Sequence, residues 1–187
     1  MAQNAVATTS TDALFKKGFC ELQVAGGFFF SQNFHDVARP QMNDLDAMTR
    51  LGWVITDPIL PGILRGNFEV MAEFFGGGFV KGPADALGGA SLFLQYNVVQ
   101  SNAKFVPYWH VGLGGAYSDG YQSQPQRELG SPMLFDVQAG FGSRFLINEK
   151  WGIFLEANWR HLSNGGLSER NTGLNSAGSW LGVSWFF

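Results

Sequence analysis

The most constraining feature of this sequence is an alternation of apolar and polar residues that recurs over long stretches. The stretch 133–147, for example, places apolar side chains at most odd positions and mostly polar side chains or glycines at even ones. Side chains of a β-strand point alternately to its two faces, whereas a helix repeats every 3.6 residues. The sequence therefore predicts strands that each have one apolar and one polar face.

Eight stretches show this pattern, at about 18–30, 46–56, 66–76, 88–98, 105–117, 133–147, 151–163 and 174–187. Ten or more residues are long for a strand of a soluble protein, but they match the tilted span of a bilayer. An even number of antiparallel strands can close into a barrel with both chain ends at one rim. We therefore predict an all-β fold, an eight-stranded antiparallel transmembrane β-barrel over residues 18–187.

The segments between the strands indicate how such a barrel would be oriented. With residues 1–17 as an N-terminal periplasmic segment and the first strand running outward, four connections become outer loops: 31–45, 77–87, 118–132 and 164–173. The residues after Met1 resemble the start of a mature secreted protein, so we expect that a signal peptide precedes them in the native precursor. One inner connection, 57–65, is longer than the short periplasmic turns typical of such barrels.

The charged residues of the strands decide which face points inward, because all of them lie on the polar faces. They include Glu21, Arg50, Glu69, Glu73, Asp136, Arg144, Glu156 and Arg160. A basic side chain on the lipid face would cost roughly 2–4 kcal/mol at the membrane midplane. We therefore expect the charges inside, where opposite signs can pair in the narrow lumen of an eight-stranded barrel.

Composition excludes several other classes of protein. Only 14% of the residues are charged, the net charge is -3, and no basic cluster is larger than two lysines, so no nucleic-acid partner is expected. The sequence has no stretch of 18 consecutive apolar residues, so no transmembrane helix is predicted. A soluble lipocalin-like barrel is the alternative, but it would carry Lys and Glu on its outer strand faces. The alternating, aromatic C-terminus ending at Phe187 also favours a membrane barrel, because it would promote aggregation of a soluble protein.

Two residues that could perform catalysis lie at the end of the seventh stretch. His161 and Ser163 have the same parity as Ile153, Leu155 and Trp159, so they fall on the lipid-facing side near the headgroup level. A hydroxyl nucleophile needs a base within hydrogen-bond reach, and residues two apart on a strand share a face. By itself, a His-x-Ser pair at a membrane boundary is more often simply an interfacial polar pair.

The residues that follow this pair favour a catalytic role over an interfacial one. His161-x-Ser163-Asn164 and the Asn- and Gly-containing segment up to residue 175 resemble the outer-membrane lipid A 3-O-deacylase (PagL) family. The resemblance is detailed over about 161–175 and architectural elsewhere. It implies that Ser163 is the nucleophile and His161 the general base.

The resemblance also implies the supporting residues of the site. Asn171 and the backbone N–H of Gly166 match positions that hold the oxyanion, and Asn164 matches a motif residue of supporting role. Asn175 is a departure, because it occupies the place of the family's catalytic Glu. An amide oxygen can still accept a hydrogen bond from the imidazole N–H, as in papain-like sites, but it offers no negative charge.

Two further residues of the loop have alternative roles that the sequence leaves open. Glu169 could supply the missing acid, although a solvated loop charge is the simpler interpretation, and Arg170 could contact a glucosamine phosphate. His110 shares the predicted lumen face and is interpreted as part of the interior polar network, and His35 falls in the first outer loop.

The first functional hypothesis is an outer-membrane esterase that removes an acyl chain from lipid A. It needs no cofactor and no metal, and its site would face the outer leaflet, where the partner would be lipopolysaccharide. The second is a non-catalytic structural barrel or a degenerate deacylase-like subunit, for which Asn175 is the best support. A homodimer or a larger membrane assembly remains open at this stage.

Overall fold

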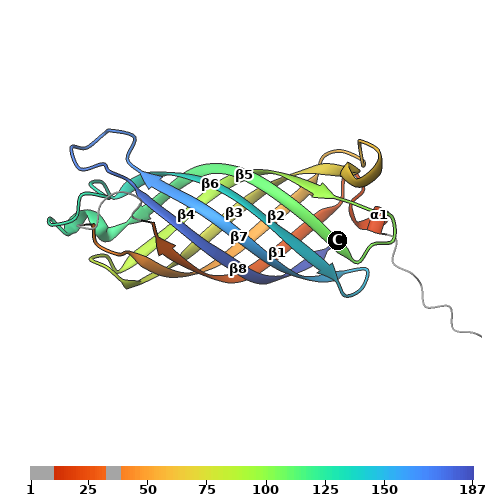
Figure 1. Ribbon diagram of the computed structural model, residues 1–187, viewed down its shortest axis with the longest axis horizontal. Helices are drawn as coiled ribbons and strands as arrows, with labels where there is room; N and C mark the ends of the chain where they lie inside the picture. Colours follow the sequence, from red (N-terminus) through yellow and green to blue (C-terminus); the bar gives the residue numbers. More distant parts are fainter. Residues whose placement is uncertain (1–10, 33–38) are drawn as a thin grey trace, which may run out of the picture.

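The structure, a computed structural model, describes residues 11–32 and 39–187 and confirms the predicted barrel. Eight strands, each antiparallel to its neighbours, close in chain order, with β1 pairing with β8. The strands are β1 Cys20–Ser31, β2 Asn43–Val54, β3 Gly66–Lys81, β4 Ala86–Val98, β5 Phe105–Ser118, β6 Met133–Leu146, β7 Trp151–Ser163 and β8 Leu174–Phe186. The first short helix, α1 (Thr11–Leu14), lies at the same end as the C-terminus, which we call the terminal end; the opposite end is the loop end (Figure 1).

Two short 3-10 helices complete the description of secondary structure. They are η1 (Gly62–Leu64) and η2 (Asp119–Gln122), in the connections after β2 and after β5. Among the described residues, no helix is long and apolar enough to cross a membrane. The predicted mature start near Met1 and the predicted loop residue His35 lie outside the described residues.

The largest difference from the predicted strand boundaries is in β3, which continues to Lys81 instead of ending near residue 76. The glycines at 76–78 interrupt the alternation, so the sequence suggests a loop there. In the barrel they remain paired with β2, and a side chain at Gly77 would lie only 2.1 Å from Leu45 O. Glycine allows this close approach of two strands, and the loop predicted at 77–87 is correspondingly short.

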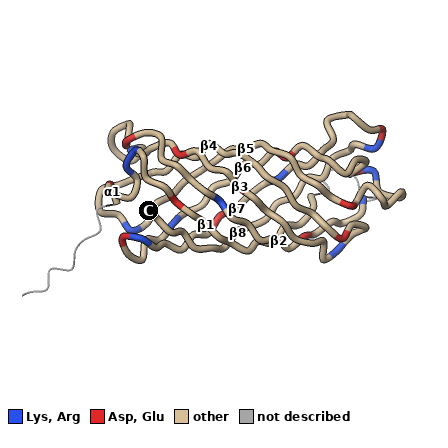
Figure 2. Tube along the Cα trace, turned by 180° about the vertical axis from the view of Figure 1, so that it is seen from behind, with Lys and Arg blue, Asp and Glu red and all other residues tan. Residues whose placement is uncertain are grey.

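The predicted assignment of the two barrel faces is confirmed. All eight charged strand residues named above are at most 1% exposed, whereas outward residues such as Leu113 and Phe141 are about 70% exposed. An uncharged, apolar outer wall around a charged interior is the arrangement of a membrane barrel and the reverse of a soluble one. Charged residues accordingly lie along the barrel as well as at both of its ends (Figure 2).

The buried charges pair inside the lumen, with each of three arginines contacting two carboxylates. Arg50 donates to Glu73 and Glu156 at 2.6 and 2.7 Å, and Arg144 donates to Glu21 at 2.6 Å. The remaining contacts are Arg144 with Glu69, and Arg160 with Asp44 and Asp46. His110 lies in the same interior network, as expected, 3.6 Å from Glu156. Charge pairing compensates for the loss of water around these groups.

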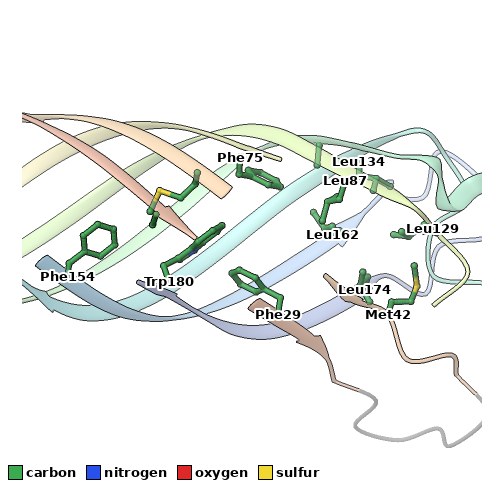
Figure 3. Close-up of a cluster of buried hydrophobic side chains, with 14 residues drawn as sticks. Phe29, Met42, Phe75, Leu87, Leu129, Leu134, Phe154, Leu162, Leu174 and Trp180 are labelled. Atoms are coloured by element: carbon green, nitrogen blue, oxygen red, sulfur yellow. The ribbon is translucent and has the colours of Figure 1, made fainter. Parts of the chain in front are cut away.

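Apolar side chains fill both ends of the lumen. Toward the loop end, a cluster includes Phe29, Leu129, Leu162 and Trp180 (Figure 3). At the terminal end, Phe15, just after α1, packs on Phe186 with ring centroids 5.5 Å apart. Of the predicted N-terminal segment 1–17, the residues from 11 onward therefore pack against this end of the barrel. The interior is filled with side chains, as predicted for eight strands.

Candidate active site

The centre of the candidate site is a contact between β7 and β8 on the outer wall. The strand register places His161 opposite Asn175, and the imidazole Nδ1 lies 2.8 Å from Asn175 Oδ1. Directly opposed residues of an antiparallel pair project to the same side of the sheet. With a proton on Nδ1, the amide oxygen accepts it and leaves Nε2 free to act as a base.

Ser163 is the last residue of β7 and lies on the same face as His161. Both side chains are partly exposed. Within the described residues, no hydrogen bond joins His161 to Ser163. In unliganded active sites the bond between nucleophile and base is often long and shortens when substrate binds.

Asn164 organises the loop that follows Ser163. It is 1% exposed, its backbone N–H donates to Asn171 Oδ1 at 2.7 Å, and its own Oδ1 accepts the N–H of Gly166 at 3.0 Å. Its side-chain N–H also donates to Arg170 O at 3.1 Å. Because the donor to Asn171 is a backbone N–H, the Asn171 oxygen must be the accepting atom, and its NH₂ group remains available to another acceptor.

The N–H of Gly166 was expected to face an oxyanion, but in this structure it is engaged by Asn164 Oδ1. Gly166 has a φ of +84°, and the preceding Gly165 has a φ of +63°. Two successive residues in this region of backbone space favour glycine and produce the tight turn after Ser163. Asn164 therefore stabilises this turn through its hydrogen bonds.

The His161 ring has two further close neighbours, Trp159 and Gly173, which are not among the candidate site residues. Trp159 stacks on the imidazole with ring centroids 6.0 Å apart and planes 15° apart. Gly173, with a φ of +74°, lies so close that a side chain there would come within 2.7 Å of His161 Cε1. The shared parity of Trp159 and His161 could have indicated the first contact, whereas no local signal in the sequence indicates the second.

Another outer segment, 119–132, supports the site loop from the side. Arg170 donates three hydrogen bonds to backbone carbonyls of this segment, to Tyr121 O at 2.6 Å and to Ser123 O and Gln126 O at 2.9 Å. The N–H groups of residues 172 and 173 donate to the carbonyls of residues 127 and 128. Figure 1 shows both segments at the loop end, 119–132 in green-blue and 164–173 in blue.

These contacts bear on the two alternatives for the charged loop residues. Arg170, for which a phosphate contact was one alternative, uses its guanidinium to join the two outer segments. Glu169 is exposed, and its side chain has no hydrogen bond or ion pair with the rest of the described chain. Across residues 11–32 and 39–187, no group of three His, Cys, Asp or Glu side chains is placed to hold a metal ion.

From His161 toward the terminal end, the outer wall has a shallow apolar groove that crosses β5, β6, β7 and β8. Its lining includes the small residues Ala139, Ala157 and Ala177 and the rings of Trp109 and Trp159. Ala177 pairs with Trp159 in the strand register, one step along the face from the His161–Asn175 pair. The groove therefore leads along the lipid-facing wall to the candidate site.

Comparison with known proteins decides the family of this chain. The family profile for lipid A 3-O-deacylase (PagL) matches residues 63–184, which include every candidate site residue. The chain belongs to the PagL family. No curated protein sequence matches it significantly.

Solved structures agree with this fold. The outer membrane enzyme PagL shares 17% identity with a TM-score of 0.57, covering 88% of this chain and 98% of its own. Neisserial surface protein A shares 14% with a TM-score of 0.56, and the N-terminal barrel of OprF from Pseudomonas aeruginosa shares 16% with 0.58. Each of these two covers 91% of this chain and 98% of its own. At these identities the likeness extends to the barrel alone, and the PagL family match adds the relationship in sequence.

Proposed function

We propose that this chain is an outer-membrane esterase that removes an ester-linked acyl chain from lipid A. The observation that carries the proposal is the 2.8 Å contact of His161 with Asn175 on the apolar outer wall, beside Ser163. A histidine oriented in this way next to a hydroxyl is what acyl transfer requires. Its position on the wall suits a substrate that lies in the membrane, and membership of the deacylase family supports the same chemistry.

In the proposed mechanism, Ser163 Oγ attacks the ester carbonyl while His161 Nε2 takes the hydroxyl proton. Asn175 Oδ1 accepts the Nδ1 proton and so holds the ring in the productive tautomer. The tetrahedral intermediate collapses, the C–O bond to the sugar breaks, and His161 gives its proton to the departing oxygen. A water molecule, activated by the same base, then hydrolyses the acyl-serine and releases the fatty acid.

The negative oxygen of the intermediate needs hydrogen-bond donors that are already in place. The NH₂ group of Asn171 is one candidate, because its oxygen is held by the Asn164 backbone. The N–H of Gly166 becomes a second donor only if the Asn164 side chain releases it. We assign Asn164 the role of positioning the Asn171 donor.

The substrate would lie with its acyl chain along the apolar groove and its sugar at the level of the outer loops. The ester bond then meets Ser163 at the boundary between the apolar wall and the polar loops. In this proposal the site faces the outer leaflet, where lipopolysaccharide would be the substrate. The largely apolar lining of the groove accommodates a saturated chain without a hydrogen-bond requirement.

The test is mass spectrometry of lipid A after incubation in detergent with the refolded protein. We expect the wild type to remove one hydroxyacyl chain and Ser163→Ala and His161→Ala to remove none, while both variants keep the heat-resistant mobility of a folded barrel. An unchanged lipid A spectrum with folded wild type would reject the esterase. Loss of folding in both variants would instead indicate that these residues are structural.

One observation favours a second candidate function, a barrel without catalysis. The resemblance implies a carboxylate at position 175, where this chain has an amide, and the His161 ring has no hydrogen bond to Ser163 within the described residues. A degenerate deacylase would gain activity when the acid is restored by Asn175→Glu. An active wild type would exclude this candidate directly.

A further inference from the structure

The connection between β2 and β3 at the terminal end is unusually apolar for a turn outside a barrel. Ile63 is 86% exposed, and Ile59, Leu60 and Leu64 are 41–60% exposed. The turn between β6 and β7 is short by comparison and consists of polar residues, Asn148, Glu149 and Lys150, after Ile147. Both turns lie at the end that holds the C-terminus (Figure 1). Exposed aliphatic groups at such density indicate a surface that is covered by something other than water.

The segment 57–65, which we call the apolar turn, lies against the outer wall. Tyr96 of β4 has the parity of the lipid-exposed residues Leu92 and Leu94, yet it is only 6% exposed. Its hydroxyl donates to Leu64 O at 2.6 Å, and its ring packs edge-on against Phe68 of β3 at 5.0 Å. The apolar turn therefore covers a part of the wall that would otherwise face lipid.

The backbone of the apolar turn has partners within the protein for several of its polar groups. Gly62 O accepts the N–H of Arg65 at 3.1 Å and the side chain of Gln100 at 3.1 Å. Ile59 and Gly66 exchange two backbone hydrogen bonds, at 2.6 and 3.0 Å. Where a segment enters the apolar part of a bilayer, its backbone polar groups must be satisfied internally. This turn meets that condition at several carbonyls although it is not a strand.

We propose that the apolar turn inserts its aliphatic side chains into the lipid leaflet at the terminal end of the barrel, at the boundary between headgroups and acyl chains. The occupant of this surface is phospholipid, because the turn is continuous with the apolar wall that already faces lipid, including Trp53, which is 58% exposed. Arg65 remains on the protein side, bound to Asp12 and to Val99 O, both at 2.8 Å. An interfacial segment of this kind anchors the barrel at a fixed depth.

The test compares the depth of two labels at the same end of the barrel. Cys20→Ser removes the native thiol, and Ile63→Cys or Glu149→Cys then carries a single environment-sensitive fluorophore. The proteins are placed in phospholipid nanodiscs, where both leaflets are open to solutes, and each label is exposed to iodide or to lipid with a nitroxide near the headgroup. Glu149 is the matched control, since it lies in the polar turn at the same end.

We expect nitroxide lipid to quench the label at residue 63. We also expect iodide to quench this label at least about five-fold less than the label at residue 149. Tyr96→Phe, which removes only the hydroxyl that holds Leu64 O, should increase iodide access at residue 63. Equal iodide access at the two labels would overturn the proposal. Protection of residue 63 from both quenchers would also overturn it and would indicate a protein partner or a second copy on this surface.

Discussion

Restoring a carboxylate opposite His161 tests the proposed relay most directly. Asn175→Asp changes one amide nitrogen to oxygen and leaves the length of the side chain unchanged, so the 2.8 Å contact with Nδ1 can persist. The new negative charge favours the imidazolium that forms when His161 takes the Ser163 proton. We therefore expect the turnover number to rise.

The expected size of the increase follows from the geometry. A 2.8 Å contact places the centres of the imidazolium and carboxylate charges about 4 Å apart, where their attraction is about 1–4 kcal/mol at effective dielectric constants of about 80 to 20. Both side chains are partly exposed, so solvent screening favours about 1–3 kcal/mol. This range corresponds to roughly a 5- to 150-fold increase in turnover number.

The assay is the initial rate of fatty acid release from lipid A in detergent, with heat-modified mobility as the check on folding. Asn175→Ala removes the acceptor and should lower the turnover number, whereas the control Thr172→Asp adds a charge in the exposed loop that precedes β8. If Asn175→Asp does not raise the rate and Asn175→Ala does not lower it, residue 175 does not orient His161 and the relay is wrong. Combining Ser163→Ala with Asn175→Asp should abolish any gain.

The remaining predictions concern the supports of the site and of the barrel. Arg170→Ala should lower the turnover number by about 10-fold, because three hydrogen bonds to the 119–132 segment are lost. The control Arg127→Ala, which removes an exposed charge nearby, should not lower it. An equal loss in both variants would show that these hydrogen bonds do not support the site. Gly173→Ala should lower turnover with folding intact, because its side chain would displace the His161 ring; wild-type rates would contradict this. Arg50→Met should destabilise the barrel by about 3–5 kcal/mol in urea unfolding, since two buried carboxylates lose their partner; unchanged stability would refute the pairing.

The contrast between β3 and β7 shows which local patterns suffice for prediction. In β7 the alternation from 151 to 163 is uninterrupted, so its limits, its outward face and the shared face of His161 and Ser163 all follow from parity. In β3 the glycines at 76–78 carry no side chains and erase the pattern, so the end of the strand is predicted too early. Alternation can be recognised only where the residues carry side chains. A glycine that permits a close contact between strands therefore gives no such signal.

Sequence alone determined the features that depend on neighbouring residues: the strands, their two faces, the burial of charge and the motif that begins at His161. Tertiary structure decided the features that join distant residues. It selected Glu156 as a partner of Arg50 across 106 positions, turned Arg170 toward the carbonyls of another segment, and folded the apolar turn over Tyr96. A two-residue period specifies which way a side chain points, whereas its partner is set by strand register and barrel closure, which are properties of the whole chain.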